Sequence, residues 1–84
     1  MTRFILVHRF PPAATQDDVF AMAHAAVSRS PGDIRWLRSW VAGADGILFC
    51  EWEAPSAEAI RAVLEGLDLC PVEAIYRVKP LWFA

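Results

Sequence analysis

Apolar and polar positions recur with two different periods along this chain, and the change of period predicts its elements. Arg3–Arg9 is a short run of β-branched and aromatic residues that ends before a proline pair, so we expect a strand there. Thr15 is followed by acidic residues and then by apolar residues at helical spacing, which predicts a helix that Thr15 caps and that ends near Arg29.

The second half of the chain predicts two strands, a helix and a last strand. Ile34–Val41 and Ile47–Glu53 read as a β-hairpin around a glycine-bounded turn, a helix opens at Ser56 and closes at Gly66, and a strand spans about Ala74–Lys79. The order βαββαβ predicts an α+β fold, a ferredoxin-like sandwich in which two helices cover one face of a four-stranded antiparallel sheet. We expect one domain over residues 1–84.

A two-residue hairpin loop decides which side chains share a face of the sheet. The face assigned to the core collects Leu37, Ser39, Val41, Leu48, Cys50 and Trp52. The face left open collects Trp36, Arg38, Trp40, Phe49, Glu51 and Glu53. On this arrangement Cys50 is a packed core thiol.

The open face is the most informative feature of the pattern, because it places aromatic rings around an arginine–glutamate cluster that no helix covers. We expect it to form a homodimer interface, since a chain with four Trp and five Phe has little interior to bury them. The same face is our candidate small-molecule site, with aromatic walls and convergent polar groups. Its ligand-binding residues are then Trp36, Arg38, Trp40, Phe49 and Glu51.

Charge and hydropathy limit the partners of the chain. Eight basic against ten acidic residues give a net charge of −2, which supplies no basic stripe for nucleic acid. No apolar run approaches the roughly 20 residues that cross a bilayer, and the N-terminal residues do not read as a secretory signal. We therefore expect a cytoplasmic protein in which Cys50 and Cys70 are reduced thiols.

The face that His8 occupies is left open by the pattern, because both alternating sets of its strand are apolar. Pointing to the open side, His8 lies near Glu51 or Glu53 and is a metal ligand or a general base. Pointing inward, it is a hydrogen-bonded histidine at the edge of the core. The candidate metal site is accordingly His8, Glu51 and Glu53.

Three segments carry a resemblance to a known family: Trp36–Val41, Cys50–Pro55 and Glu58–Arg61. With them the chain resembles a family of small bacterial ferredoxin-like proteins, mostly of unknown function, that includes a nickel-binding member. The resemblance implies a dimer that binds a divalent metal such as nickel through histidine and acidic side chains. Family members often carry histidine at the position of Arg38 and shortly after that of Arg61, so a nickel role here rests on His8, His24 and the acids.

Two functions from different classes follow. The first is a non-enzymatic dimeric binding protein that holds a divalent metal or a small ligand at the open sheet face, favoured because no catalytic motif is recognisable. The alternative is a dimeric α+β barrel enzyme of the cofactor-independent oxygenase, cyclase or isomerase type, with its pocket on the same face. In that enzyme His8 is the general base and Arg38 stabilises a developing enolate.

The C-terminal segment Leu81-Trp82-Phe83-Ala84 is unusually apolar for a chain end. We expect it to pack across a dimer partner or across the edge of its own sheet.

Overall fold

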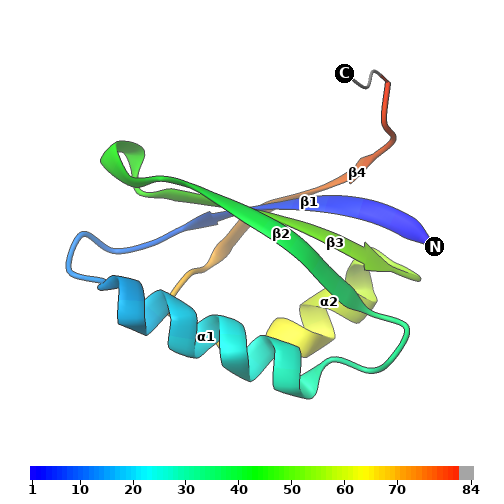
Figure 1. Cartoon of the computed structure of the whole chain (residues 1–84), viewed down its shortest axis with the longest axis horizontal. Coiled ribbons are helices and arrows are strands. Elements are labelled where there is room, and N and C mark those ends of the chain that lie inside the picture. Colours follow the sequence, from blue (N-terminus) through cyan, green and yellow to red (C-terminus); the bar gives the residue numbers. More distant parts are fainter. Residues whose placement is uncertain (82–84) are drawn as a thin grey trace.

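The computed structural model describes residues 1–81 and has the predicted βαββαβ order. Its elements are β1 (Thr2–Arg9), α1 (Gln16–Arg29), β2 (Arg35–Ala42), the 3₁₀ turn η1 (Gly43–Asp45), β3 (Ile47–Ala54), α2 (Ala57–Leu64) and β4 (Val72–Val78). The strands form one antiparallel sheet in the order β2-β3-β1-β4. Both helices lie against one face and leave the other bare (Figure 1), which confirms the ferredoxin-like α+β sandwich.

Side chains outside the helices fix where each helix begins. The hydroxyl of Thr15 accepts a hydrogen bond from the backbone N–H of Asp18 at 3.1 Å, and the Asp18 carboxylate accepts one from the N–H of Thr15 at 2.9 Å. These bonds lower the pKa of the Asp18 carboxyl. Ser56 caps α2 by accepting from the N–H of Ala59 at 3.1 Å. Each cap satisfies N–H groups that the first turn of a helix leaves free.

The core lies between the sheet and the helices. Strands β1 and β3 contribute alternate residues to it, and α1 and α2 contribute one face each. Its buried apolar residues include Phe4, Leu6, Met22, Ala26, Leu48, Cys50, Trp52, Ile60 and Val63. Leu48, Cys50 and Trp52 were expected on this face, and Cys50 is only 1% exposed.

The predicted two-residue loop is wrong, since Gly43–Gly46 connects the last paired residues. The predicted hairpin register is right near the turn and wrong at the far end. Ala42 pairs with Ile47 and Arg38 with Glu51, so the faces alternate there as expected. Beyond Arg38 the register shifts at Leu37, and Trp36 pairs with Trp52. A β-bulge of this kind adds one residue to one strand and turns every residue after it to the opposite face. Trp36 therefore faces the helices, which corrects its expected place on the open face.

Three other residues expected in the core are not buried in it. Leu37 is the bulge residue rather than part of the buried cluster. Ser39 and Val41 do face the helix side, but both are exposed, Val41 by 66%. The reason is that β2 is an edge strand, and the helix layer does not close over the part of it near the turn (Figure 1).

Two further expectations concern the end of the chain. The last strand starts at Val72, two residues before the predicted Ala74, with a register shift between Val7 and His8 of its neighbour β1. Leu81 is 98% exposed, so it does not pack on its own sheet edge. The rest of that predicted apolar segment, residues 82–84, lies outside the described residues. Within residues 1–81, no helix has the length and apolar character needed to cross a membrane.

Candidate functional site

Five charged side chains form a connected cluster on the bare face of the sheet, here called the ion cluster: Arg3, Arg35, Arg38, Glu51 and Glu53. The Nε of Arg38 lies 2.7 Å from Oε1 of Glu51, and the Nε of Arg3 lies 3.4 Å from its Oε2. Arg3 also reaches Glu53 at 3.2 Å through Nη2, and Arg35 reaches it at 3.9 Å. Adjacent strands β2, β3 and β1 supply these residues, so the sheet register holds the cluster together.

The carboxylates of the ion cluster are already engaged. Glu51 is 8% exposed, and arginine nitrogens lie against both of its oxygens. A buried carboxylate needs such partners, because charge without them is costly to remove from water. Arginine nitrogens therefore already occupy the carboxylate oxygens of the cluster, which are not free to bind a cation.

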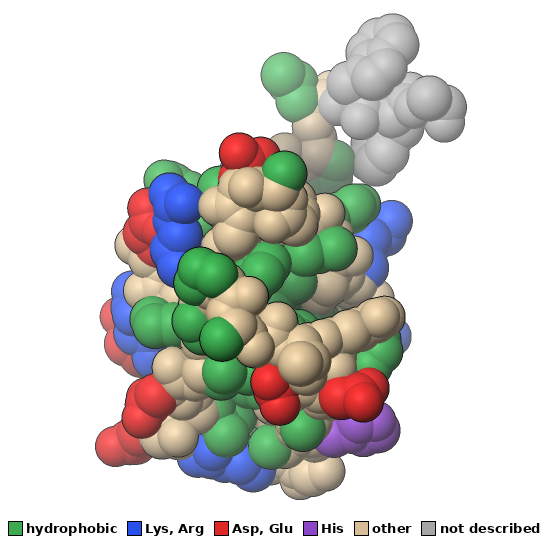
Figure 2. Space-filling view, turned by 90° about the vertical axis from the view of Figure 1, so that its left-hand side faces the viewer, with side chains coloured by type: hydrophobic (Ala, Val, Ile, Leu, Met, Phe, Trp, Pro, Cys, Tyr) green, Lys and Arg blue, Asp and Glu red, His purple; other side chains and the backbone are tan. Residues whose placement is uncertain are grey.

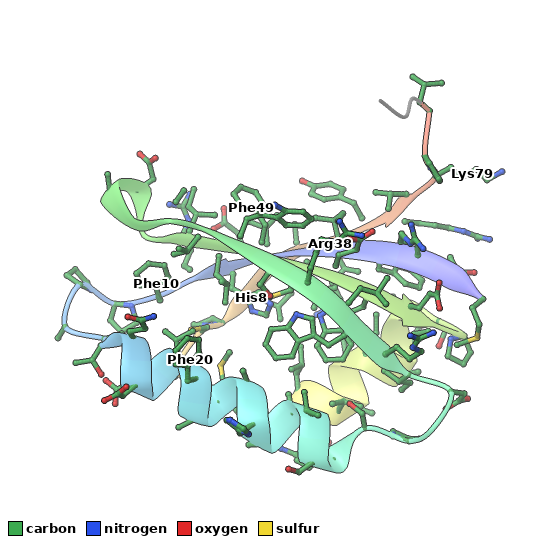
Figure 3. The ribbon with its side chains drawn as sticks, viewed as in Figure 1. His8, Phe10, Phe20, Arg38, Phe49 and Lys79 are labelled. Atoms are coloured by element: carbon green, nitrogen blue, oxygen red, sulfur yellow. The ribbon has the colours of Figure 1, made fainter. Side chains whose placement is uncertain are left out.

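Apolar side chains surround the ion cluster on the same face. The pairing registers put Ile5, Val7 and Tyr76 there with Phe49, and the Cζ of Arg38 lies 5.9 Å from the ring centroid of Trp40. Figure 3 shows Phe49 and Arg38 on the bare side of the ribbon. Tyr76 is 58% and Trp40 49% exposed. The bare face is thus largely apolar with a paired charged centre, as the pattern of β3 predicted.

His8 lies on the other face of the sheet. It pairs with Leu48 and is 2% exposed, and its Nδ1 lies 3.0 Å from the carbonyl oxygen of Cys70. Because a carbonyl only accepts, Nδ1 carries the proton and donates it. Burial lowers the pKa of His8, against a smaller opposite effect of this hydrogen bond. The inward alternative for His8 is therefore the one that the structure adopts (Figure 3).

This placement overturns two predicted constellations. The metal set of His8, Glu51 and Glu53 is wrong, because the imidazole and the two carboxylates lie on opposite faces of one sheet. The catalytic pair of His8 and Arg38 is wrong for the same reason, since Arg38 pairs with Glu51 on the bare face.

The donors present do not fit a nickel centre. Across residues 1–81, no three side chains of the His, Cys, Asp and Glu types gather closely enough to hold a metal ion. Imidazole is a suitable nickel ligand, but His24 is exposed on α1 and His8 is buried and bonded to the Cys70 carbonyl.

The helix side of β2 holds a contact that the sequence did not predict. The Trp36 and Trp52 rings stack with centroids 5.2 Å apart and 12° between their planes. Trp36 Nε1 donates to the hydroxyl of Ser39 at 2.7 Å, and that hydroxyl donates to Cys50 Sγ at 3.2 Å. Burial raises the pKa of the Cys50 thiol to about 11. Cys50 is thus a packed, unreactive thiol, as expected, because the thiolate is the nucleophilic form.

A cavity of about 550 Å³ opens beside this stack, between α1 and the β2–β3 edge. Trp36, Ser39 and Val41 line it from β2, and Val19 and Ala23 line it from α1. Sequence reasoning missed it, because it treated the helix-facing side of β2 as filled core. The signal in the sequence is the small size of Ala23 and Ser39 at positions expected to pack.

Fold and site together define a small ferredoxin-like α+β protein with a bare, charge-centred sheet face. Residues 4–78 match the model of the family described as "Nickel responsive protein SCO4226-like", and the chain belongs to that family. A solved relative is SCO4226 from Streptomyces coelicolor A3(2), at 27% sequence identity and a TM-score of 0.76. The match covers 90% of this chain and 94% of that one. A comparison with curated proteins found no match.

Proposed function

We propose that this chain is a non-enzymatic, homodimeric binding protein of the nickel-responsive family, and that its dimer forms by packing of two bare sheet faces. The observation that carries the proposal is the apolar bare face around the largely buried Glu51. Predicted ligand-binding residues Arg38, Trp40, Phe49 and Glu51 share this face, and the proposal assigns them to the interface.

The energetics of the bare face support a second copy as its occupant. Burying apolar surface contributes about 25 cal/mol per Å², and large exposed apolar patches are uncommon on monomers. Tyr76 and Trp40 are about half exposed in the single chain and lose that exposure when covered. The glutamates of the ion cluster have arginine partners within their own chain, so covering them leaves no carboxylate without a cation.

Light scattering after size exclusion tests the dimer. The unmodified chain is expected at twice the mass of 9.4 kDa, and Phe49→Glu is expected to run as a folded monomer, because it places a charge at the centre of the apolar interface. Val27→Glu is the matched control, since Val27 is 57% exposed on α1, on the far side of the sheet. A monomeric unmodified chain, or a Phe49→Glu variant that remains dimeric, contradicts the proposal.

Nickel enters the proposal through the family description, and this chain's donors argue against a nickel centre built within one chain. Calorimetric titration with NiCl₂ is therefore expected to show no saturable binding tighter than about 100 μM. His24→Asn tests for weak nickel binding at the protein surface, because His24 is exposed and His8 is buried. Saturable binding tighter than that limit, unchanged by His24→Asn, contradicts this expectation.

A cytoplasmic location belongs to the same proposal. Both Cys50 and Cys70 are free and buried in the described structure, and reducing compartments keep thiols in that state. Fractionation of cells that express a tagged chain is expected to recover it with cytosolic proteins, and recovery outside the cytosol contradicts this location.

A further inference from the structure

The cavity between α1 and the hairpin of β2 and β3 is an apolar space at one end of the molecule. Phe10 and Phe20 lie on the helix side of the sheet at this end (Figure 3), and both line the cavity. Figure 2 shows hydrophobic side chains gathered across the end of the molecule that holds the β2–β3 turn and the N-terminus of α1. Phe20 is 55% and Val41 66% exposed, so the cavity has an open, apolar mouth.

Small side chains keep this space from filling. Ala14 precedes the cap of α1, Ala23 follows two turns into the helix, and Ser39 faces them from β2; all three line the cavity. The hydroxyl of Ser39 is held between Trp36 and Cys50, so its direction is fixed by the core behind it. The inner part of the wall is therefore positioned by contacts with the core, and exposed side chains form its mouth.

The lining also limits the chemistry of an occupant. Four aromatic residues contribute to it, Phe10, Phe20, Trp36 and Trp40, and among the described residues no Asp, Glu, Lys, Arg or His does. A charged ligand would lose its hydration without gaining a counter-ion, which is costly. Gln16, Thr15 and Ser39 supply a few polar groups. A volume of about 550 Å³ falls in the range of small-molecule sites.

We propose that this cavity binds one uncharged aromatic molecule of about two or three rings per chain. The inference rests on the proposed function in one respect, that the chain is a binding protein. Trp40 is shared with the proposed interface, but the test below uses α1 residues and leaves Trp40 and the bare sheet face unchanged.

The neutral fluorophore N-phenyl-1-naphthylamine is the probe. Titration into the full chain is expected to give saturable binding of one molecule per chain, with enhanced, blue-shifted probe emission and quenching of tryptophan fluorescence. Ala23→Phe fills the cavity and is expected to weaken binding at least tenfold. Ala21→Phe is the matched control, since Ala21 is exposed on the same helix and does not line the cavity, and it is expected to bind as the unmodified chain does.

Two further measurements keep the result decisive. Phe20→Ser removes an exposed apolar wall with little effect on folding, and it is expected to weaken binding several-fold even if Ala23→Phe folds poorly. The sulfonated analogue 1-anilinonaphthalene-8-sulfonate shares the ring framework and is expected to bind this site at least tenfold more weakly. Three results would overturn the proposal. The first is no saturable binding of N-phenyl-1-naphthylamine, and the second is equal binding by Ala23→Phe and Ala21→Phe. The third is equal binding of both probes at a site that is sensitive to Phe20→Ser. Light scattering on the same samples reports the dimer separately, so either proposal can fail without the other.

Discussion

His8 shows how one buried side chain makes the stability of this protein depend on pH. Its ring extends from β1 and is buried beside the segment before β4, where its Nδ1–H donates to the Cys70 carbonyl. Burial favours the neutral imidazole and lowers the pKa of His8 from its ordinary value of 6.5. The native state therefore resists protonation at a pH where the unfolded chain accepts a proton.

Acidification is expected to destabilise the fold through His8. Below about pH 6.5 the unfolded state binds more protons than the native state, so the free energy of unfolding falls as the pH falls, with a limiting slope of about 1.4 kcal/mol per pH unit. Urea unfolding between about pH 7.5 and pH 5.5 measures this slope. Hydrogen bonds lower the pKa values of the Asp18 and Glu73 carboxyls, so their effects appear at still lower pH.

Two histidine variants separate this cause from others. His8→Asn keeps an N–H donor beside Cys70 and removes the titration, so its stability is expected to change little over the same pH range. His24→Asn alters the exposed histidine and is expected to keep the slope of the unmodified chain. If His8→Asn keeps the pH dependence of the free energy of unfolding, that dependence does not come from the buried imidazole.

The orientation of His8 could not be predicted from the sequence, and the reason is physical. Both faces of β1 are apolar, with Phe4 and Leu6 on one side and Ile5 and Val7 on the other, so periodicity does not distinguish them. The partner that decides is the carbonyl of Cys70, which lies 62 residues away in sequence. Only the tertiary fold brings them together.

At the scale of elements, the bulge at Leu37 explains why the site differs from its prediction. Uninterrupted alternation would put Arg35 and Arg38 on opposite faces. With one residue bulged, both arginines face the glutamates of β3, and Trp36 turns inward to stack on Trp52. The bulge thus improves both the ion cluster and the core. In the sequence, the bulge corresponds to Arg35 and Arg38 on either side of an apolar pair. A strand that alternates without interruption fits the same residues, so the sequence does not predict the bulge.

Removal of the bulge tests this account. Deletion of Leu37 makes Trp36 and Arg38 neighbours, which lie on opposite faces of a regular strand, so Trp36 keeps its stack on Trp52 and Arg38 its pairing with Glu51. We therefore expect the deletion to change the free energy of unfolding by about 1 kcal/mol or less. Leu37→Ala keeps the extra residue and is expected to cost about 1 kcal/mol or less, because Leu37 is outside the buried cluster. Urea denaturation gives both values.

The outcome for the pair is informative in either direction. A loss of about 2–4 kcal/mol in the deletion, with little change in Leu37→Ala, would contradict this placement of the bulge, because it would mean that Trp36 had lost its stack. Tryptophan emission gives a second readout, since Trp36 is expected to stay inward in both variants, and a shift to longer wavelength in the deletion would show that it had become exposed.

Local signals predicted the elements themselves well. Thr15 and Ser56 cap their helices as expected, and both strands of the hairpin form, because caps and turns are decided within a few residues. The cavity at Ser39 and Ala23 was not predicted, since its existence depends on how far α1 stands from an edge strand. That distance is a property of the assembled layers.

At the scale of the whole molecule, the chain uses its two sheet faces differently. The helix-covered face holds the core, the tryptophan stack and His8, and the bare face holds the ion cluster among exposed apolar residues. A chain of 84 residues buries a smaller fraction of its surface than a larger domain does, so its stability is modest when it is alone. Packing of two bare faces would add buried surface, and it would couple folding to association.

That coupling predicts a melting temperature that depends on concentration. When a folded dimer unfolds to separate chains, dilution favours the unfolded state by mass action, and a chain of this size is expected to gain about 4 °C in Tm for each tenfold rise in concentration. Differential scanning calorimetry over two decades of concentration measures it. Phe49→Glu is expected to melt lower and at a temperature independent of concentration, whereas Val27→Glu keeps the dependence, because Val27 lies on α1 away from the bare face. A concentration-independent Tm for the unmodified chain would mean that the bare face has no second copy on it in the folded state.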